Sequence, residues 1–224
     1  MPSTKTDFLI DLLGKRIVNG DYAPGTSLPS EMKLSEEFNL SRNVIREALR
    51  SLVSKNLIEN IPYKGAFVSP TVKWNYLDPD ILRWELTQKV NSPILLSLNE
   101  MRLKIEPIVA RWAAEKATSQ DLVYIESAFN KMSLNKNNIT NFNNARIQFH
   151  RAILNSTHNL VLRQLDTALC SLLFITFHND QNFSEDDILI RLKKCEKLFN
   201  AIRYQNIEDA EMMAIDILSH PEAE

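Results

Sequence analysis

The sequence predicts a mainly α-helical protein built in two parts, and three observations lead to this fold class. Only four glycines occur in 224 residues, which favours helices over a hairpin-rich sheet. Apolar residues recur at helical spacing along most of the chain. Strand-like patterning is confined to one stretch, "LIENIPYKGAFVSP", and the helical period returns after it.

The N-terminal part begins with three helices and ends in a hairpin. The apolar spacing of "TKTDFLIDLLGKRIVNG" predicts a helix that stops at Gly20. Ser30 is expected to cap a short helix over residues 31–38, and Ser41 is expected to cap a third helix. Two extended runs then flank a turn at residues 62–65. Together these elements predict an N-terminal winged helix-turn-helix.

The third predicted helix carries arginines on one side. In "NLSRNVIREALRSL", Arg42, Arg46 and Arg50 follow one another at four-residue spacing, so they share one helical face. Residues 41–55 hold four cations and one anion, whereas the whole chain has a net charge of −2. Because only one surface is basic, the sequence favours specific binding of nucleic acid over indiscriminate binding.

The part after Pro70 is patterned throughout as helices. They are expected over residues 79–88, 93–116, 119–134, 140–155, 160–177, 185–204 and 207–219. Pro107 lies inside the second of these helices and is expected to kink it. The three tryptophans are expected to pack between the linker and the helices. The sequence therefore predicts a C-terminal antiparallel all-helical bundle, with domains at residues 1–72 and 73–224.

The composition narrows the class of protein further. Cys170 and Cys195 are the only cysteines, and they show no paired spacing. They offer no disulfide framework, which fits a reducing compartment. The N-terminus lacks the pattern of a signal peptide, and no apolar run approaches the length of a membrane span. No nucleophile–base pair of an enzyme is visible. We therefore expect a cytoplasmic protein that is not an enzyme and does not enter a membrane.

Several motifs carry a family resemblance over nearly the whole chain. The segment "PGTSLPSEMKLSEEFNLSRNVIREALRSLVSKNLIENIPYKGAFVS" resembles the DNA-binding domain of GntR-superfamily transcription regulators. "EMRLKIEPIVARWAAEKAT" and "FHRAILNSTHNLVLRQL" resemble the effector-binding FCD domain of the FadR-type branch. The resemblance implies a ligand-responsive repressor. A homodimer of such a protein would bind a palindromic operator in double-stranded DNA, because its two-fold axis matches that of the operator.

The resemblance and the shape of the major groove together predict the DNA contacts. A recognition helix places its N-terminus nearest the base edges, and a glycine at the wing tip allows close approach to an adjacent groove or to the backbone. The expected DNA-binding residues are Ser41, Arg42, Asn43, Arg46, Lys64 and Gly65. Arg42 and Arg46 are each expected at guanine or at phosphate, with the choice left open.

Two features limit what the resemblance implies for DNA binding. Many relatives carry an arginine where this chain has Met32, so a contact that relatives make there is expected to be lost. Arg50 is expected to lie too far along the helix. The alternative for all these arginines is that they only solvate the outer face of an amphipathic helix.

The resemblance also raises the question of a metal. FadR-type domains often hold a metal through an aspartate four residues before a histidine, and through two later histidines. Here His150 matches, but the other positions hold Arg146, Cys195 and an aliphatic residue near 217–218. A guanidinium is a cation and cannot coordinate a metal ion. We therefore expect neither a metal nor another cofactor.

A positively charged side chain in place of a metal suggests an anionic effector. Arg102 matches an arginine that commonly faces the ligand cavity in relatives, and a guanidinium can bind a carboxylate through two hydrogen bonds. The expected effector-binding residues are Arg102, Arg146, His150 and Asn159. The expected ligand is a sugar acid, such as galactonate or a related aldonate or hexuronate. The alternative for Arg146 is a solvent-facing side chain or an ion pair with a glutamate.

Three other functions of the helical part stay open at this point. The effector could be a fatty-acyl or other organic acid, which a cavity lined almost entirely by leucine, isoleucine and phenylalanine would favour. The helical part could also be a metal-dependent sensor or an enzyme-like domain. Finally, it could be a dimerisation module without a ligand, which would need no cavity.

Overall fold

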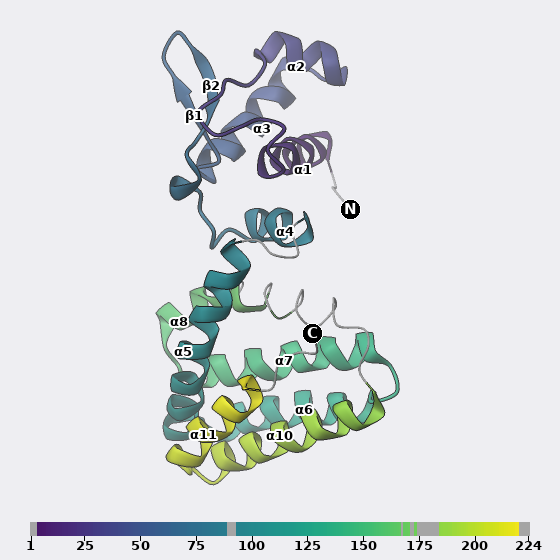
Figure 1. The fold of residues 1–224 in the computed structure, drawn as a ribbon, viewed down its shortest axis with the longest axis vertical. Coiled ribbons are helices and arrows are strands. Elements are labelled where there is room, and N and C mark those ends of the chain that lie inside the picture. Colours follow the sequence, from purple (N-terminus) through teal and green to yellow (C-terminus); the bar gives the residue numbers. More distant parts are fainter. Residues whose placement is uncertain (1–3, 89–92, 167, 171–172, 174–183, 220–224) are drawn as a thin grey trace. The chain divides into compact units, whose positions relative to one another are not determined.

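The structure is a computed structural model that describes residues 4–88, 93–166, 168–170, 173 and 184–219. It confirms a mainly helical chain with a small two-stranded sheet (Figure 1). Contacts divide the chain into two compact units, Met1–Ile94 and Leu95–Glu224. Among the helices of the described residues, none has the length and apolar character needed to cross a bilayer.

The N-terminal unit contains the expected winged helix-turn-helix. Its elements are α1 (Lys5–Val18), α2 (Glu31–Phe38), α3 (Arg42–Ser54), β1 (Ile58–Ile61) and β2 (Gly65–Val68). Ser30 and Ser41 cap α2 and α3, because each hydroxyl accepts a hydrogen bond from a backbone N–H of the following turn. Asn39 adopts the left-handed conformation that ends α2 and allows a short turn into α3.

The hairpin and the first helices share one hydrophobic core. The strands β1 and β2 pair antiparallel, from Ile58 opposite Val68 to Ile61 opposite Gly65. The buried side chains of this core come from α1, α2, α3 and the hairpin, and include Leu9, Leu13, Leu34, Ile45, Leu52, Leu57 and Val68. The apolar side of α3 therefore faces inward, which leaves its arginine side for solvent.

Helix α4 (Pro79–Gln88) packs on α1 within the same unit. The ring of Trp84 is completely buried and lies directly over Gly14, where a Cβ would overlap the ring. The Trp84 Nε1–H donates a hydrogen bond of 2.8 Å to Asp11. We expected the tryptophans to pack between the linker and the helical bundle, but Trp74 and Trp84 both belong to the N-terminal core.

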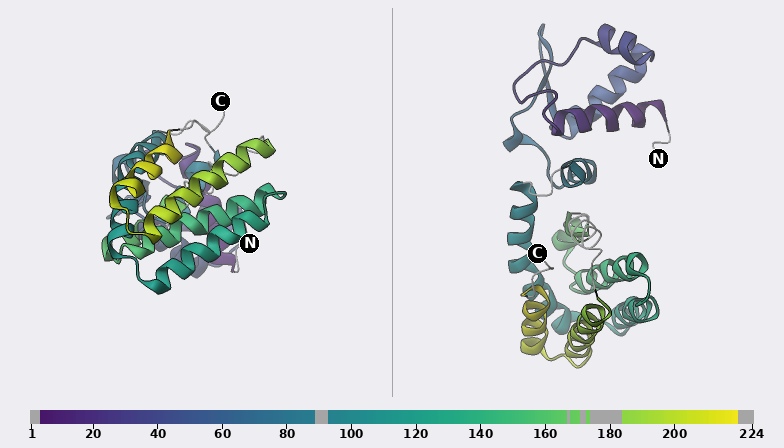
Figure 2. Two further views of the ribbon diagram at one scale, coloured as in Figure 1. Left: turned by 90° about the horizontal axis from the view of Figure 1, so that it is seen from below. Right: turned by 45° about the vertical axis from the view of Figure 1, so that its right-hand side comes forward.

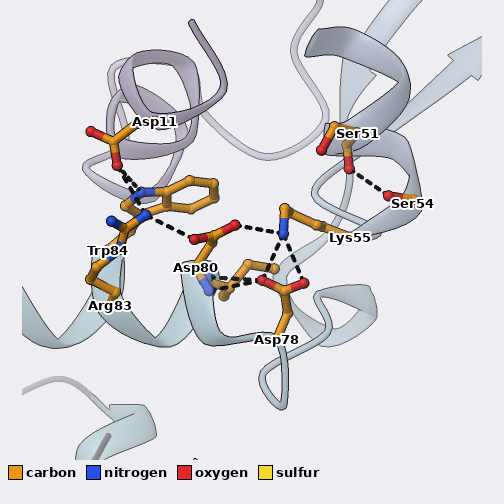
Figure 3. A network of polar contacts seen from close by, with 9 residues as sticks. Asp11, Ser51, Ser54, Lys55, Asp78, Asp80, Arg83 and Trp84 are labelled. Carbon is orange, nitrogen blue, oxygen red and sulfur yellow. Dashed lines mark hydrogen bonds and ion pairs between the residues drawn. The ribbon is translucent and has the colours of Figure 1, made fainter. Parts of the chain in front are cut away.

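Charged side chains fasten the start of α4 to the end of α3 (Figure 3). The ammonium of Lys55, which follows α3, lies 2.9 Å from Asp78 and 2.8 Å from Asp80. Arg83 bridges Asp80, at 2.8 Å, and Asp11 of α1, at 3.1 Å. The contact-defined unit therefore extends through α4, whereas the boundary of the two functional domains at residues 72 and 73 stays a prediction.

The described residues of the C-terminal unit form helices joined by turns and loops, without a strand. Its helices are α5 (Pro93–Lys116), α6 (Ser119–Leu134), α7 (Ile139–Ser156), α8 (Leu160–Gln164), α10 (Glu185–Arg203) and α11 (Ile207–Leu218). Helix α5 runs through Pro107 as one element, and the expected kink stays a prediction. The expectation of one helix over residues 160–177 is wrong, because α8 ends at Gln164 with Leu165 as its C-cap, and part of the remaining range lies outside the described residues. The other helices begin and end within two residues of their expected limits.

The helices of the C-terminal unit surround a second hydrophobic core. Figures 1 and 2 show α6, α7 and α10 running side by side, with α11 beside α10. An ion pair of 3.0 Å between Arg111 of α5 and Glu211 joins α5 to α11. Buried side chains from five helices fill the centre, and include Val109, Ile125, Met132, Phe142, Phe149, Leu198 and Ile217.

The packing of Trp84 on Gly14 predicts an unusual response to alanine. In an ordinary helix interior, alanine is more favourable than glycine by about 0.5–1 kcal/mol. Because Trp84 fills the space that the methyl group needs, we expect Gly14→Ala to destabilise the protein by about 1–3 kcal/mol. Urea unfolding followed by tryptophan fluorescence would measure this change.

The control is the same substitution in a variant that lacks the indole ring of Trp84. In a Trp84→Leu background, Gly14→Ala should be neutral or stabilising. A Gly14→Ala variant that is more stable than the wild-type chain would contradict the packing of α4 on α1.

Candidate nucleic-acid interface and effector cavity

Helix α3 presents polar side chains on its outer face. Arg42, Asn43, Arg46 and Arg50 are all exposed, as the four-residue spacing predicted. The opposite side of the helix is buried through Ile45, Ala48, Leu49 and Leu52. The first turn of the helix is also open, because its capping residue, Ser41, is exposed. Both the side chains and the N-terminus of α3 are therefore exposed to solvent within the N-terminal unit.

The wing offers a second exposed element in the same unit. Lys64 lies in the turn of the hairpin and Gly65 directly follows it as the first residue of β2, and both are exposed. Gly65 has a φ of 94°, which an L side chain rarely adopts, so the turn depends on glycine here. All six residues expected to contact DNA thus lie on the surface, at the start of α3 or in the wing.

The arginines on α3 differ in their partners. The Nε–H of Arg46 donates a hydrogen bond of 2.8 Å to Glu31 at the start of α2. Arg42 and Arg50 form no ion pair within the part of the chain that the structure describes. Sequence analysis did not predict this contact of Glu31, which is the glutamate of the "LPSE" motif at residues 28–31. An exposed ion pair of this kind adds little stability, so stability does not explain its presence.

The helical unit holds two guanidinium groups away from water. Arg102 of α5 is 6% exposed and Arg146 of α7 is 2% exposed. The alternative that Arg146 points to solvent is therefore wrong. A buried charge is costly unless opposite charge or hydrogen bonds compensate for it. These two side chains therefore need anionic or polar groups close by.

Glu106 supplies one negative charge, which sequence analysis missed. It lies four residues after Arg102 on α5 and forms an ion pair with its Nε–H. Its other carboxylate oxygen lies 3.4 Å from Nδ1 of His150. Burial acts to raise the pKa of Glu106, but the charge of Arg102 and the hydrogen bonds from Arg102 and His150 outweigh it and lower the pKa to about 2. The carboxylate is therefore ionised at neutral pH.

His150 is the neutral member of this cluster. Burial lowers its pKa, and the nearby guanidinium groups of Arg102 and Arg146 act in the same direction against the charge of Glu106. Asn143, a buried amide three residues before Arg146 on α7, is another polar neighbour that sequence analysis missed. Helical spacing could have pointed to it, since the same face carries Arg146 and His150.

Two small cavities adjoin the charged cluster. One of about 30 Å³ is lined by Glu106 and His150 together with apolar side chains of α5, α7 and α10. The other, of about 70 Å³, is lined by Arg146, Arg191, Lys194 and Asp187 among others. Lys194 also pairs with Asp216 at 3.1 Å. The lining of the second cavity thus carries more positive than negative side chains.

The positions that hold a metal in relatives meet at these cavities, but the residues here do not fit one. Arg146, His150, Cys195 and Ile217 all line one cavity or the other. Burial raises the pKa of the Cys195 thiol to about 11, whereas a metal needs the thiolate. Within the described residues there is no group of three histidine, cysteine, aspartate or glutamate side chains arranged to hold a metal.

Asn159 has the capping role that the sequence suggested. Its side-chain oxygen accepts hydrogen bonds from the backbone N–H groups of Val161 and Leu162, and so begins α8. It is not among the residues that line either cavity. Its expected contact with an effector therefore stays a prediction without geometric support.

Comparison with known families matches both units of the chain. The model of bacterial regulatory proteins of the gntR family matches residues 5–68. The model of the FCD domain matches residues 97–220. The first covers the winged helix-turn-helix, and the second covers the helices that carry the charged cluster.

Individual relatives agree with these family models. The chain is 45% identical to the galactonate operon transcriptional repressor of Escherichia coli (strain K12), over 98% of this chain and 96% of that protein. It is 30% identical to the HTH-type transcriptional regulator LutR of Bacillus subtilis (strain 168), over 92% of this chain and 94% of that protein. A solved structure of Lar, which controls expression of the Listeria monocytogenes agr system, matches with a TM-score of 0.64 and 18% identity, over 97% and 94% of the two chains. This last likeness concerns the fold alone.

The buried ion pair predicts a pH-dependent stability that one substitution removes. The pKa of Glu106 is about 2 in the folded chain and about 4.5 in an unfolded one, so its contribution is complete above about pH 4.5 and is lost as the pH falls toward 2. We expect Glu106→Gln to destabilise the chain by about 3 kcal/mol at neutral pH, because it leaves buried arginines without their carboxylate. Urea unfolding across this pH range would measure both effects.

A matched control lies on the same helix. Glu115 pairs with Arg111 at the same four-residue spacing but at the surface. We expect Glu115→Gln to change the stability by less than about 0.5 kcal/mol. Equal losses in the two variants would rule out a special role for the buried carboxylate.

Proposed function

Because the chain belongs to the gntR family of bacterial regulatory proteins and carries an FCD domain, we propose that it represses an operon for the use of a sugar acid. The proposed effector is galactonate or a related aldonate or hexuronate. The observation that carries the effector class is the burial of the guanidinium groups of Arg102 and Arg146 in the effector domain, together with the mainly positive lining of the second cavity. The cytoplasm is the proposed location, since the operator lies there.

The proposed DNA contacts use the two exposed elements of the N-terminal unit. Ser41, Arg42, Asn43 and Arg46 would meet base edges and phosphates in the major groove, while Lys64 and Gly65 would follow the adjacent groove or backbone. We propose a homodimer, because a two-fold symmetric protein places two recognition helices on two halves of a palindromic operator.

The proposed effector site uses the charged cluster of the helical unit. A sugar acid carries one carboxylate and several hydroxyl groups, which suit the guanidinium of Arg146 and the polar groups of His150 and Asn143. The two cavities hold about 30 and 70 Å³ in the structure, and small-molecule sites usually enclose about 300–1,000 Å³. Binding would therefore enlarge the site, and a movement of the cavity walls is the proposed origin of the response.

The lining of the first cavity favours one rival effector. Apart from Glu106, His150 and Arg151, the described residues around it are aliphatic or small, with Cys170 among them. An organic acid with an apolar tail would match this lining, with its carboxylate at the arginines. The two candidates differ in the tail of the ligand and share its anionic head.

The proposed DNA binding is tested with a duplex that is selected by its affinity for the protein. The full-length chain would enrich a sequence from a random pool of duplexes, and gel shifts would compare that duplex with a scrambled one. We expect Arg46→Ala to weaken binding to the enriched duplex by about 5- to 100-fold, the discrimination that one base contact typically provides.

The control for charge is an exposed arginine of the helical unit. Arg203 pairs with Glu126 at the surface of the helical unit, and Arg203→Ala should leave DNA affinity unchanged. Full affinity in the Arg46→Ala variant would argue against α3 as the recognition helix.

The effector half is tested by thermal stability in the presence of candidate acids. Galactonate, gluconate, glucuronate and octanoate would each be added, together with a chelator in parallel samples. A ligand at about 100 times its Kd stabilises the folded chain by about 2.7 kcal/mol. We expect one of the sugar acids to do so, with no change on chelation, and to release the enriched duplex.

Substitution of Arg146 separates binding from folding. Arg146→Met removes the charge but keeps an unbranched side chain, and urea unfolding of the variant in the absence of ligand measures its cost to stability. We expect this variant to fold and to lose the response to the acid, while Arg203→Met keeps it. Stabilisation by octanoate alone would replace the sugar acid with the rival effector, and stabilisation by none would refute an anionic effector of either kind.

A further inference from the structure

We propose that Glu31 is a positioning residue that holds Arg46 toward a base edge and weakens binding to DNA of other sequences. The inference rests on the proposed DNA-binding role of α3 and assigns a function to the glutamate of the "LPSE" motif. Its starting point is the hydrogen bond of 2.8 Å from Nε of Arg46 to Glu31, which joins the first turn of α2 to the second turn of α3.

Both ends of this contact stand on fixed backbone. Glu31 directly follows Ser30, whose hydroxyl caps α2, and a carboxylate in the first turn is favoured by the helix dipole. The turn between α2 and α3 is short and passes through the left-handed Asn39. Ser41 then caps α3. The carboxylate is therefore held at a set distance from the side of α3 that carries Arg46.

The atom that Glu31 uses leaves the recognition edge of the arginine open. A guanidinium has one Nε–H and two terminal NH₂ groups, and guanine is recognised by two parallel donors at O6 and N7. With Nε held by Glu31, the pair of terminal nitrogens remains for the base. The side chain of Arg46 is 56% exposed, so this edge is accessible.

The neighbouring arginines provide the contrast. Arg42 and Arg50 lie one turn before and one turn after Arg46 on the same face, and neither forms an ion pair within the described ranges. Arg42 is thus free to follow a phosphate, which positions a protein on DNA without specifying the sequence, and Arg50 lies further from the leading end of the helix. Three arginines at equal spacing thus divide into one that is held for a base and two that are not.

The charge of Glu31 acts on specificity in a second way. Its side chain is 41% exposed on the surface that would face DNA. Binding to arbitrary DNA depends on neutralising phosphates, so a carboxylate here opposes it. At the operator, the base contact of Arg46 compensates for this repulsion. Discrimination arises from a contact to the right sequence and a penalty on the wrong ones.

The test measures discrimination, which a merely structural ion pair would not change. Dissociation constants would be measured at one salt concentration for the enriched and the scrambled duplex. We expect Glu31→Ala to lower the ratio of the two affinities by about tenfold, partly through tighter binding to the scrambled duplex. The ratio for Glu31→Gln should lie between those of the wild-type chain and Glu31→Ala, since an amide oxygen accepts the hydrogen bond without carrying the charge. Glu36→Ala removes the same charge from an exposed site on the same helix and should leave the ratio unchanged.

Repeating the selection with the variants identifies the base involved. Glu31→Ala and Arg46→Ala should lose sequence preference at the same base pair of each half-site, and the double variant should lose no more. Loss at different base pairs, additive losses, or an unchanged ratio in Glu31→Ala would overturn the inference and leave the DNA-binding function intact. A wild-type chain that enriches no sequence would overturn both.

Discussion

The helical unit has to keep two guanidinium groups in its interior, and this constraint determines what the unit can bind. Glu106 faces Arg102 with a carboxylate whose pKa of about 2 keeps it ionised. His150 adds no further positive charge, because burial lowers its pKa. Among these side chains and Arg146, one negative charge therefore accompanies two positive ones. A chain that had only to fold would gain from apolar residues at these positions, since replacing buried charges often stabilises a protein. Under the proposed function, these buried charges serve the binding of an anionic effector.

The N-terminal unit meets a different constraint, which is rigidity. Trp84 fills the space above Gly14, and Lys55 ties the end of α3 to the carboxylates that begin α4. Helix α4 is therefore not a loose connector but a part of the body that carries α3 and the wing. Any displacement of α4 would therefore carry the recognition helix with it, and the proposed palindromic operator would tolerate little change in the separation of two such helices. Affinity for an acid and affinity for DNA can be coupled in this way without any change inside the DNA-binding unit.

The sequence predicts those features that depend on neighbours in the chain. Ser30 and Ser41 cap their helices, and the hairpin forms where turn residues separate two extended runs. The position of α4 could not be predicted, because it depends on a contact between Trp84 and Gly14, which are far apart in the sequence. The outward face of α3 followed from its four-residue spacing. The resemblance implied a cavity-facing Arg102, whereas the burial of Arg146 stayed open until the structure was known. Glu106 was missed although it lies four residues from Arg102. Glu31 was missed because only the fold brings it to Arg46.

Arg146 also changes what kind of signal the effector domain can receive. A metal ion binds ligands of several kinds, and its own binding depends on deprotonated donors and on the supply of metal. A guanidinium stays positively charged over the whole physiological pH range and cannot be removed by a chelator. With His150 neutral and Glu106 ionised, no group in the described cluster changes its charge near neutral pH. Under the proposed function, the response of such a site would follow the concentration of the anion. The effector would bring its own negative charge, so its binding would not need a change of protonation in the site.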